Sequence, residues 1–449
     1  MKRALSAAML LFVAAAPTTL PVKIETFNTD PQWESFNNRQ TPPHFPTVTQ
    51  DFGYDPQQQA VGGQICRTSV PAWYALKLDK PLDLNQPLSF SGSFSVPEAE
   101  GGGVYLGFFN PAALRTGGRP LGSFMLFLDG ANTFVRAFTR TIAPDNQQMG
   151  ALVPPAPNVK SAIPIPADGS KHRFTVTYNH HAENGEGAFT AKVGDLPPST
   201  FTLRPGVKQQ PFAMTHFGIL NNQKQGSPMR VYFHDLKLND APIDLAKDPA
   251  WESKGNRVTF EDRHVAGFQN FGFDPARKAF GGTVWREETP SFYADNIGSL
   301  DATQPLEISG QVTLHIGAPD SAAYLAFFNA DEFKRGKDEN ILGLLIEGPS
   351  RVGHYIRPVF LNKKGVGVEP KTGAVLPPDE KPHSFSLKFD PLQRTITVNF
   401  EGQTQTIDVA AKTLDRGAAF THFGLFNALE GGSDVQIFFD NLRYTRAGN

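Results

Sequence analysis

The 449-residue sequence has little charge, one cysteine and no long apolar run after its N-terminus. Charged residues make up 19% of the chain and the formal net charge is −2, so no surface for nucleic-acid phosphates is indicated. Cys66 is the only cysteine, so no intrachain disulfide can form and stability must come from buried cores. No later stretch approaches the ~20 apolar residues of a membrane-spanning helix. We therefore expect neither a nucleic-acid partner nor a membrane span.

The N-terminus does carry a short apolar segment. Residues 1–3 are Met-Lys-Arg, and residues 4–16 are apolar or small throughout. This segment is too short to cross a bilayer core of about 30 Å, but it has the length of the apolar part of a secretory signal. We predict that residues 1–16 are a signal peptide and that the mature protein is soluble and either secreted or periplasmic.

Phenylalanine is abundant, and the apolar pattern is that of strands. The chain has 37 Phe against 9 Tyr and 4 Trp, and its 41 Gly and 37 Pro fall largely between short alternating runs such as 88–96, 172–178 and 395–400. Apolar residues at helical spacing are nearly absent. Many short strands without crossover helices predict an all-β fold of packed antiparallel sheets.

The chain is an internal duplication. Ordered matches join its two halves: residues 30–34 (DPQWE) with 248–252 (DPAWE), 52–56 (FGYDP) with 271–275 (FGFDP), 105–110 (YLGFFN) with 324–329 (YLAFFN), and 215–218 with 421–424 (both THFG). The second copy is shorter by about a dozen residues between its middle strands. A period of this length indicates whole domains rather than solenoid repeats. We predict two homologous β-sandwich domains, residues 23–241 and 242–449.

Residues 27–34 open the first copy with an aromatic strand, and residues 231–236 and 437–444 close the two copies with another. In these segments each copy resembles the concanavalin A-like (lectin/glucanase, laminin-G-like) jelly-roll superfamily, in which the last strand pairs beside the first. The resemblance implies two tandem antiparallel jelly-roll sandwiches. In this superfamily carbohydrate is usually bound or cleaved on a concave sheet, so the implied partner is a polysaccharide or glycan.

The catalytic motifs of the superfamily are missing. No Glu-x-Asp-x-x-Glu run of the retaining glucanases occurs, and the Gln-Ile-His of alginate lyases is replaced by residues 64–66 (QIC) and 283–285 (TVW). Calcium is often bound in the superfamily, but no Asp-x-Asp-x-Asp-Gly run supports it here. We predict no cofactor and no metal.

The candidate site residues are mainly polar residues kept in both copies. As catalytic candidates we take the carboxylates Glu34, Asp129, Glu252 and Glu347. Hydrolysis would need two of them, Glu34 with Asp129 or Glu252 with Glu347, at about 5 Å or 6.5–9.5 Å. As ligand-binding candidates we take Arg39, Arg67, Tyr74, Arg136, Arg257, Arg286 and Tyr293, together with the unmatched Trp73 and Trp285. The alternative for the charged residues is structural, with an Arg–carboxylate pair tying the first strand to a loop.

Three functions remain open at this point. The favoured one is a secreted carbohydrate-binding protein. The others are a polysaccharide-cleaving hydrolase or lyase and an extracellular structural or interaction module. The oligomeric state is left open.

Overall fold

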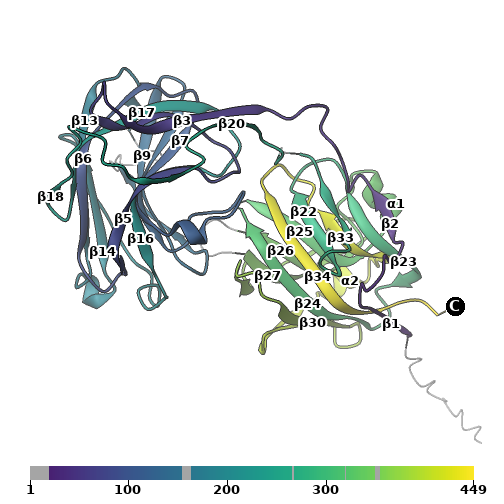
Figure 1. The fold of residues 1–449 in the computed structure, drawn as a ribbon. Coiled ribbons are helices and arrows are strands. Elements are labelled where there is room, and N and C mark those ends of the chain that lie inside the picture. Colours follow the sequence, from purple (N-terminus) through teal and green to yellow (C-terminus); the bar gives the residue numbers. More distant parts are fainter. Residues whose placement is uncertain (1–19, 154–162, 265–266, 319, 349–353, 449) are drawn as a thin grey trace, which may run out of the picture.

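The computed structural model describes residues 20–153, 163–264, 267–318, 320–348 and 354–448. The predicted signal peptide lies outside these residues. Within the described ranges, no helix has the length and apolar character needed to cross a membrane. Strands form four antiparallel sheets, which confirms the predicted all-β class (Figure 1).

The first sandwich consists of two sheets built from residues 47–261. Its β6 sheet runs in the order β15 (Ser199–Thr202), β14 (Ala188–Val193), β13 (Lys171–Asn179), β6 (Leu88–Glu98), β17 (Pro228–Leu238), β4 (Ala60–Cys66), β3 (Thr47–Asp55), β20 (Arg257–Glu261), with β18 (Ala241–Pro242) beside β17. Its β7 sheet runs β10 (Gln148–Met149), β9 (Phe134–Ile142), β8 (Ser123–Ala131), β7 (Gly103–Phe109), β16 (Met214–Asn221), β5 (Trp73–Leu82), β19 (Glu252–Lys254), with β11 (Leu152–Val153) and β12 (Ile165–Pro166) on β9. Short 3-10 helices are η1 (Pro111–Ala113) and η2 (Glu183–Gly185).

The second sandwich has the same plan. Its β24 sheet runs β21 (Asn270–Asp274), β22 (Ala279–Trp285), β34 (Asp434–Thr445), β24 (Leu306–Gly317), β30 (His383–Asp390), β31 (Thr395–Phe400), β32 (Gln403–Asp408), with β1 (Val22–Glu25) on β34. Its β25 sheet runs β2 (Glu34–Phe36), β23 (Phe292–Asp301), β33 (Ala419–Asn427), β25 (Ser321–Phe328), β26 (Ile341–Gly348), β27 (His354–Leu361), β28 (Gly367–Val368), with β29 (Ala374–Leu376) on β27. The helices are α1 (Ala330–Lys334) and α2 (Ala411–Leu414).

Phenylalanine fills the space between facing sheets. On β13 buried and solvent-facing residues alternate, as expected of a strand with one face on the core. Phe90 on the β6 sheet meets Phe108, Phe124 and Phe217 of the β7 sheet at ring-centroid distances of 5.4–5.9 Å. These edge-on contacts join the two sheets of the first sandwich.

The opening segment of each sequence copy lies in the sandwich built by the other copy. In the first copy, β1 pairs with β34 and β2 with β23. In the second copy, β19 pairs with β5 and β20 with β3. The buried Trp33 therefore belongs to the core of the second sandwich, and Trp251 to that of the first. Figure 1 shows the purple β1 and β2 on the green and yellow second sandwich before the chain crosses to the first.

This exchange corrects the expectation that the first strand pairs beside the last strand of its own copy. Strand β17, the last of the first copy, has β4, β6 and β18 as neighbours. The first sandwich is thus continuous in sequence, from β3 to β20, whereas the second needs residues 20–41, which we call the N-terminal arm. The pairing divides the chain near residues 42 and 263 and crosses the sequence-repeat boundary at 242. In a tandem repeat, the sequence matches are the same whether the structural unit begins at the repeat boundary or some residues after it, so the sequence alone does not locate the division.

Candidate functional site

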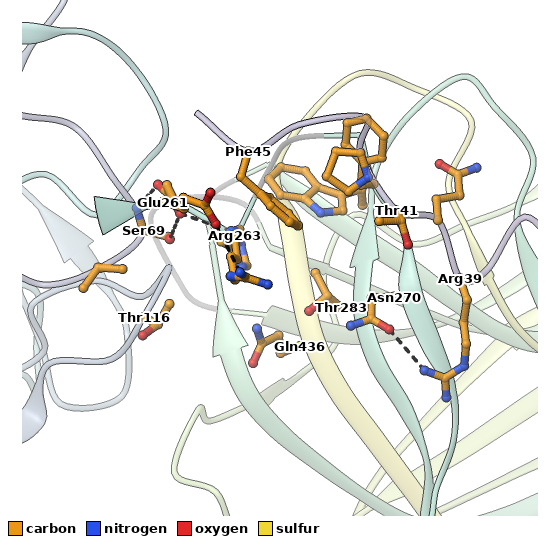
Figure 2. A pocket seen from close by; sticks show the side chains of 17 residues that line it. Arg39, Thr41, Phe45, Ser69, Thr116, Glu261, Arg263, Asn270, Thr283 and Gln436 are labelled. Atoms are coloured by element: carbon orange, nitrogen blue, oxygen red, sulfur yellow. Dashed lines mark hydrogen bonds and ion pairs between the residues drawn. The ribbon is translucent and has the colours of Figure 1, made fainter. Parts of the chain in front are cut away.

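Two connecting segments lie between the sandwiches, one at residues 39–45 and the other at residues 261–264 and 267–268. They line a cavity of about 770 Å³, which we call the crossover cavity, together with residues of both sandwiches (Figure 2). Two smaller cavities continue from it in a row. One of about 190 Å³, the bridging cavity, shares Ser69, His264 and Trp285 with it. A third, of about 230 Å³, shares Gly117 and Lys224 with the bridging cavity and lies on the β7 sheet.

Aromatic and cationic side chains lie together in the crossover cavity. The Arg263 guanidinium stands over the Phe45 ring, 4.9 Å from its centroid. Trp285 lines the cavity and packs beside the His264 ring at 5.4 Å. Arg39 lines it too, donating to the Asn270 side chain at 3.1 Å, as Figure 2 shows. A cavity with aromatic faces and a few directed polar groups is the usual form of a small-ligand site.

The second connecting segment is anchored to both sandwiches. Asp262 is buried and accepts hydrogen bonds from the Thr68 and Ser69 hydroxyls of the first sandwich at 2.5 and 2.9 Å. His264 Nε2 lies 2.9 Å from Asp434 Oδ2 on β34 of the second. Burial disfavours the charged imidazole, but Asp434 and Asp262 outweigh it and raise the pKa of His264. Carboxylates therefore fix this connecting segment to both sandwiches, Asp262 to the first and Asp434 to the second.

The third cavity, which we call the Arg67 chamber, is rich in cations. Arg67, the residue after β4, pairs with Asp129 on β8. The Arg67 and Arg140 guanidiniums stand 6.0 and 5.9 Å from the centroid of Phe127. Tyr105 stacks on the same ring at 4.5 Å. The chamber thus has an aromatic floor with guanidinium groups around it.

The structure does not bring the proposed carboxylate pairs together. Glu34 lies on the second sandwich and Asp129 on the first. Glu252 lies on the first and Glu347 on the second. The strand exchange is the cause, because it moves each opening glutamate to the opposite sandwich. Neither pair can act on one glycosidic bond in this arrangement.

Glu34 and Glu252 instead fasten the exchanged strands. Glu34 accepts from Lys334 at 2.6 Å and lies 3.0 Å from His422 Nε2; these contacts, that with Lys334 foremost, lower its pKa. Glu252 lies 3.1 Å from His216 Nε2, which together with Lys77 lowers its pKa. Burial lowers the pKa of His422 more than Glu34 raises it, so Lys334 is the cation at neutral pH. The structural alternative holds for both glutamates, with His and Lys as partners rather than Arg.

Tyr74 and Tyr293 face the cores and also hold the exchanged segments. The Tyr74 hydroxyl donates to Asp248 at 3.1 Å, and burial raises the pKa of Tyr74 to about 12. The Tyr293 hydroxyl donates to Asp30 at 3.0 Å, and burial likewise raises its pKa. Each ring packs on the tryptophan of the segment that it holds, at 5.4 Å for Tyr74 and 5.6 Å for Tyr293. These tyrosines are positioned for stability rather than for ligand contact.

Arg39 and Arg257 occupy equivalent places at the ends of the exchanged segments. Arg39 donates to the Phe273 carbonyl at 2.8 Å, and Arg257 to the Tyr54 carbonyl at 3.0 Å. Arg39 also borders the crossover cavity, whereas Arg257 borders a separate groove of about 440 Å³ on the first sandwich. Of the two, only Arg39 joins the row of three cavities.

Trp73 and Arg136 lie on the β7 sheet outside these cavities. Trp73 is 8% exposed and packs edge-on against Phe109 and His216, so it offers no open platform. The Arg136 guanidinium stands over the Phe134 ring at 4.7 Å, and Arg136 lies opposite Asp129 in the strand register.

Comparison of the two sequence copies aligns Arg136 with Arg357, but the strand register of the second sandwich shows that the two are not equivalent. Glu347 lies opposite Tyr355 in the register, so Tyr355, rather than Arg357, stands in the place of Arg136. Arg357 and Arg286 both pair with Glu347 on this outer face. Arg286 and Glu347 thus repeat the Arg67–Asp129 pair of the first sandwich.

Several residues around the cavities were not found from the sequence. They include Phe45, Asp262, Arg263 and His264 of the crossover cavity and Arg119, Arg140 and Lys224 of the Arg67 chamber. The search was for residues shared by both copies, and such a search passes over cations present in one copy alone. Comparing the copies for reversals of charge would have found Lys224, whose equivalent is Glu430. In the described part of the chain, no group of three or more His, Cys, Asp and Glu side chains is placed to hold a metal ion.

Comparison with known proteins adds little to this geometry. No family model and no curated protein matches the chain. Domains LG4-5 of the mouse laminin α1 chain align over 91% of this chain and 92% of their own, at 11% identity and a TM-score of 0.27. The VIP36 exoplasmic/lumenal domain, bound to Ca²⁺ and Man3GlcNAc, covers 38% of this chain and 79% of its own (11% identity, TM-score 0.26). A peanut lectin covers 37% and 85% (12%, 0.23).

These names fall in the superfamily that the sequence resembles. The assignment of two antiparallel sandwiches rests on the strand pairing of this chain.

Proposed function

We propose that this protein is an exported carbohydrate-binding protein and that a polysaccharide lies along the row of three cavities. The observation that carries the proposal is the continuity of the row. The crossover cavity and the bridging cavity share three lining residues, and the bridging cavity shares two with the Arg67 chamber. A polymer is the ligand class that such a row suits, because successive sugar units can occupy successive cavities.

The side chains along the row suit sugars. Trp285 and Phe45 offer ring faces, and Thr283, Asn270 and Gln436 offer hydroxyl and amide groups. Sugar rings present apolar C–H faces for the aromatics and hydroxyls for the polar groups. Cleavage is the weaker candidate, because both proposed carboxylate pairs are divided between the sandwiches. Export is supported by the sequence of residues 1–16.

The test is a panel of neutral and acidic polysaccharides, read both for bound polymer and for released sugar ends. We expect saturable binding with no released ends. Released ends would replace binding by catalysis as the function, and an absence of binding to every polymer would refute the proposal.

Variants locate the binding in the row. Arg263→Ala removes an exposed lining cation, and Trp285→Phe reduces a ring without emptying its place. We expect each to weaken binding by about five- to tenfold, the range of one aromatic or cation contact. The matched controls are Arg443→Ala, an exposed arginine on β34 away from the cavities, and Trp73→Phe, a tryptophan outside them. Equal losses in variants and controls would place the binding elsewhere.

A further inference from the structure

We propose that the Arg67 chamber binds an anionic substituent of the polysaccharide, a carboxylate or a sulfate ester, and that the first sandwich alone does so. This inference rests on the proposed function and specifies its ligand class. The chamber lining contains four cations and one carboxylate: Arg67, Arg119, Arg140, Lys224 and Asp129. Asp320 and Asp434 of the second sandwich act on Lys224 from a distance, and the cations still outnumber the carboxylates.

The cations of the chamber are held away from water. Arg119 is 7% exposed, and burial lowers its pKa to about 10. Burial lowers the pKa of Lys224 as well, and the neighbouring Arg119 and Arg67 lower it further. Burying like charges together costs free energy, which a bound anion would offset. Arg67 Nε is also buried without a hydrogen-bond partner among the described residues.

The shape of the chamber fits a charged group on a sugar ring. Two guanidiniums, of Arg67 and Arg140, flank the ring of Phe127, and planar guanidinium groups match the oxygens of carboxylates and sulfates. The volume of about 230 Å³ is below the ~300–1,000 Å³ typical of sites for drug-sized ligands. One substituted sugar unit, rather than a larger ligand, is therefore the appropriate occupant.

The second sandwich provides an internal comparison, because its equivalent positions have lost or reversed the charge. Arg140 lies opposite Met125 on β8, and Val359 lies opposite Gly343 on β26. Met125 in turn lies opposite Gly107 on β7, and Gly343 lies opposite Ala326 on β25. Gly107 and Ala326 occupy the same position in the matching segments 105–110 and 324–329. Val359 thus replaces Arg140.

Lys224 is replaced by Glu430. Each follows by three residues an asparagine that ends the equivalent strand, Asn221 on β16 and Asn427 on β33. The two asparagines make the same contact, since each side-chain oxygen accepts from a backbone N–H at 2.8 Å. The equivalence therefore rests on structure as well as on spacing.

Arg119 is replaced by Asp338. Each stands nine residues after an asparagine that caps a short helix, Asn110 or Asn329, and each acts on the equivalent tyrosine, Tyr105 in the first copy and Tyr324 in the second. Burial, with Glu369 and Glu430 nearby, raises the pKa of Asp338 to about 6, as expected where negative charge accumulates.

The retained arginine of the second sandwich is already paired. Arg286 forms ion pairs with Glu347 and Glu430, so protein carboxylates stand where an anionic ligand would bind. The duplication has thus produced one cationic chamber and one whose charge is met from within. An anionic polymer would be attracted by the first and repelled by the second.

The test measures the affinity of the mature chain for three polymers: polygalacturonate, dextran sulfate and neutral dextran. The variants Arg140→Val and Lys224→Glu each install the residue of the second sandwich. We expect each to weaken binding of the preferred acidic polymer at least tenfold at physiological ionic strength. Tighter binding of polygalacturonate assigns a carboxylate, and tighter binding of dextran sulfate assigns a sulfate ester.

Lys192→Glu is the matched control. Lys192 is exposed on β14, on the other sheet of the first sandwich, and its substitution changes the net charge as Lys224→Glu does. We expect less than a twofold effect on binding, and thermal unfolding temperatures no lower than that of the unmodified chain in all three variants. Three results would overturn this inference and leave the proposed function standing. They are an equal loss of affinity in the control and the two variants, no loss of affinity in the two variants, and an affinity for neutral dextran equal to that for the acidic polymers. No binding of any polymer would refute both.

Discussion

Trp33 provides the sharpest test of the strand exchange, because sequence and structure assign it to different domains. By sequence it opens the first copy. In the structure it is 6% exposed in the second core, with Phe27, Phe280 and Tyr293 at ring-centroid distances of 5.1–5.6 Å. Trp33→Ala would leave a cavity among these rings. Removal of a buried aromatic side chain costs about 3–5 kcal/mol, and the effect should fall on the second sandwich.

Hydrogen exchange read by mass spectrometry resolves the two sandwiches. A loss of about 3–5 kcal/mol lowers amide protection by roughly 100- to 4,000-fold in the unit that it destabilises. We expect Trp33→Ala to deprotect β22, β23 and β34 and to spare β4, β5 and β16. Trp251→Ala should do the reverse, since Trp251 packs on Tyr74 of the first sandwich.

The contrary pattern would refute the exchange. If Trp33→Ala deprotected the first sandwich and Trp251→Ala the second, each copy would fold on its own opening strand. Equal deprotection of both sandwiches by either variant would show that they unfold as a single cooperative unit. It would contradict the prediction that each tryptophan stabilises one sandwich.

Three further predictions concern the connections between the sandwiches. Deleting the N-terminal arm, residues 20–41, should lower the denaturation midpoint of the second sandwich and leave the first unchanged, as followed by hydrogen exchange. The N-terminal arm should lose protection from hydrogen exchange in acid, in two steps. The first begins below pH 6.5, because burial lowers the folded-state pKa of His422. The second begins below pH 4.5, because Lys334 lowers the folded-state pKa of Glu34. Arm protection that is constant from pH 7 to 4 would contradict this. The His264 contact should act in the opposite direction: its folded-state pKa is raised, so its stabilisation is complete below pH 6.5 and is lost as pH rises through the folded-state pKa. His264→Gln should remove that loss of stability. A pH profile of hydrogen exchange at residues 261–264 that is the same in this variant and in the unmodified chain would contradict the prediction.

The sequence predicted the class of fold because its signals are local. Alternation on β13 and the ordered repeats required no knowledge of distant contacts. The exchange could not be predicted, because residues 30–34 and 248–252 are nearly identical and would fit either sandwich. The same near-identity explains why the predicted pairing of Glu34 with Asp129 is wrong. That prediction assumed that residues of one sequence copy lie in one domain.

The site followed the same division between local and distant information. Arg67 with Asp129, and Arg286 with Glu347, could be named from the sequence because both copies keep them. The crossover cavity could not, because it exists only where Phe45, Arg263 and Trp285 meet between the sandwiches. The Arg67 chamber was half visible: its shared pair was found, and the cations that distinguish it from its counterpart were not.

A crystal structure of the mature chain with an acidic oligosaccharide tests the central claim most directly. The account predicts sugar units along the crossover cavity, the bridging cavity and the Arg67 chamber, with a carboxylate or sulfate oxygen within about 3 Å of the Arg67 or Arg140 guanidinium. An oligosaccharide bound on the second sandwich beside Arg286, or outside the row of cavities, would contradict it.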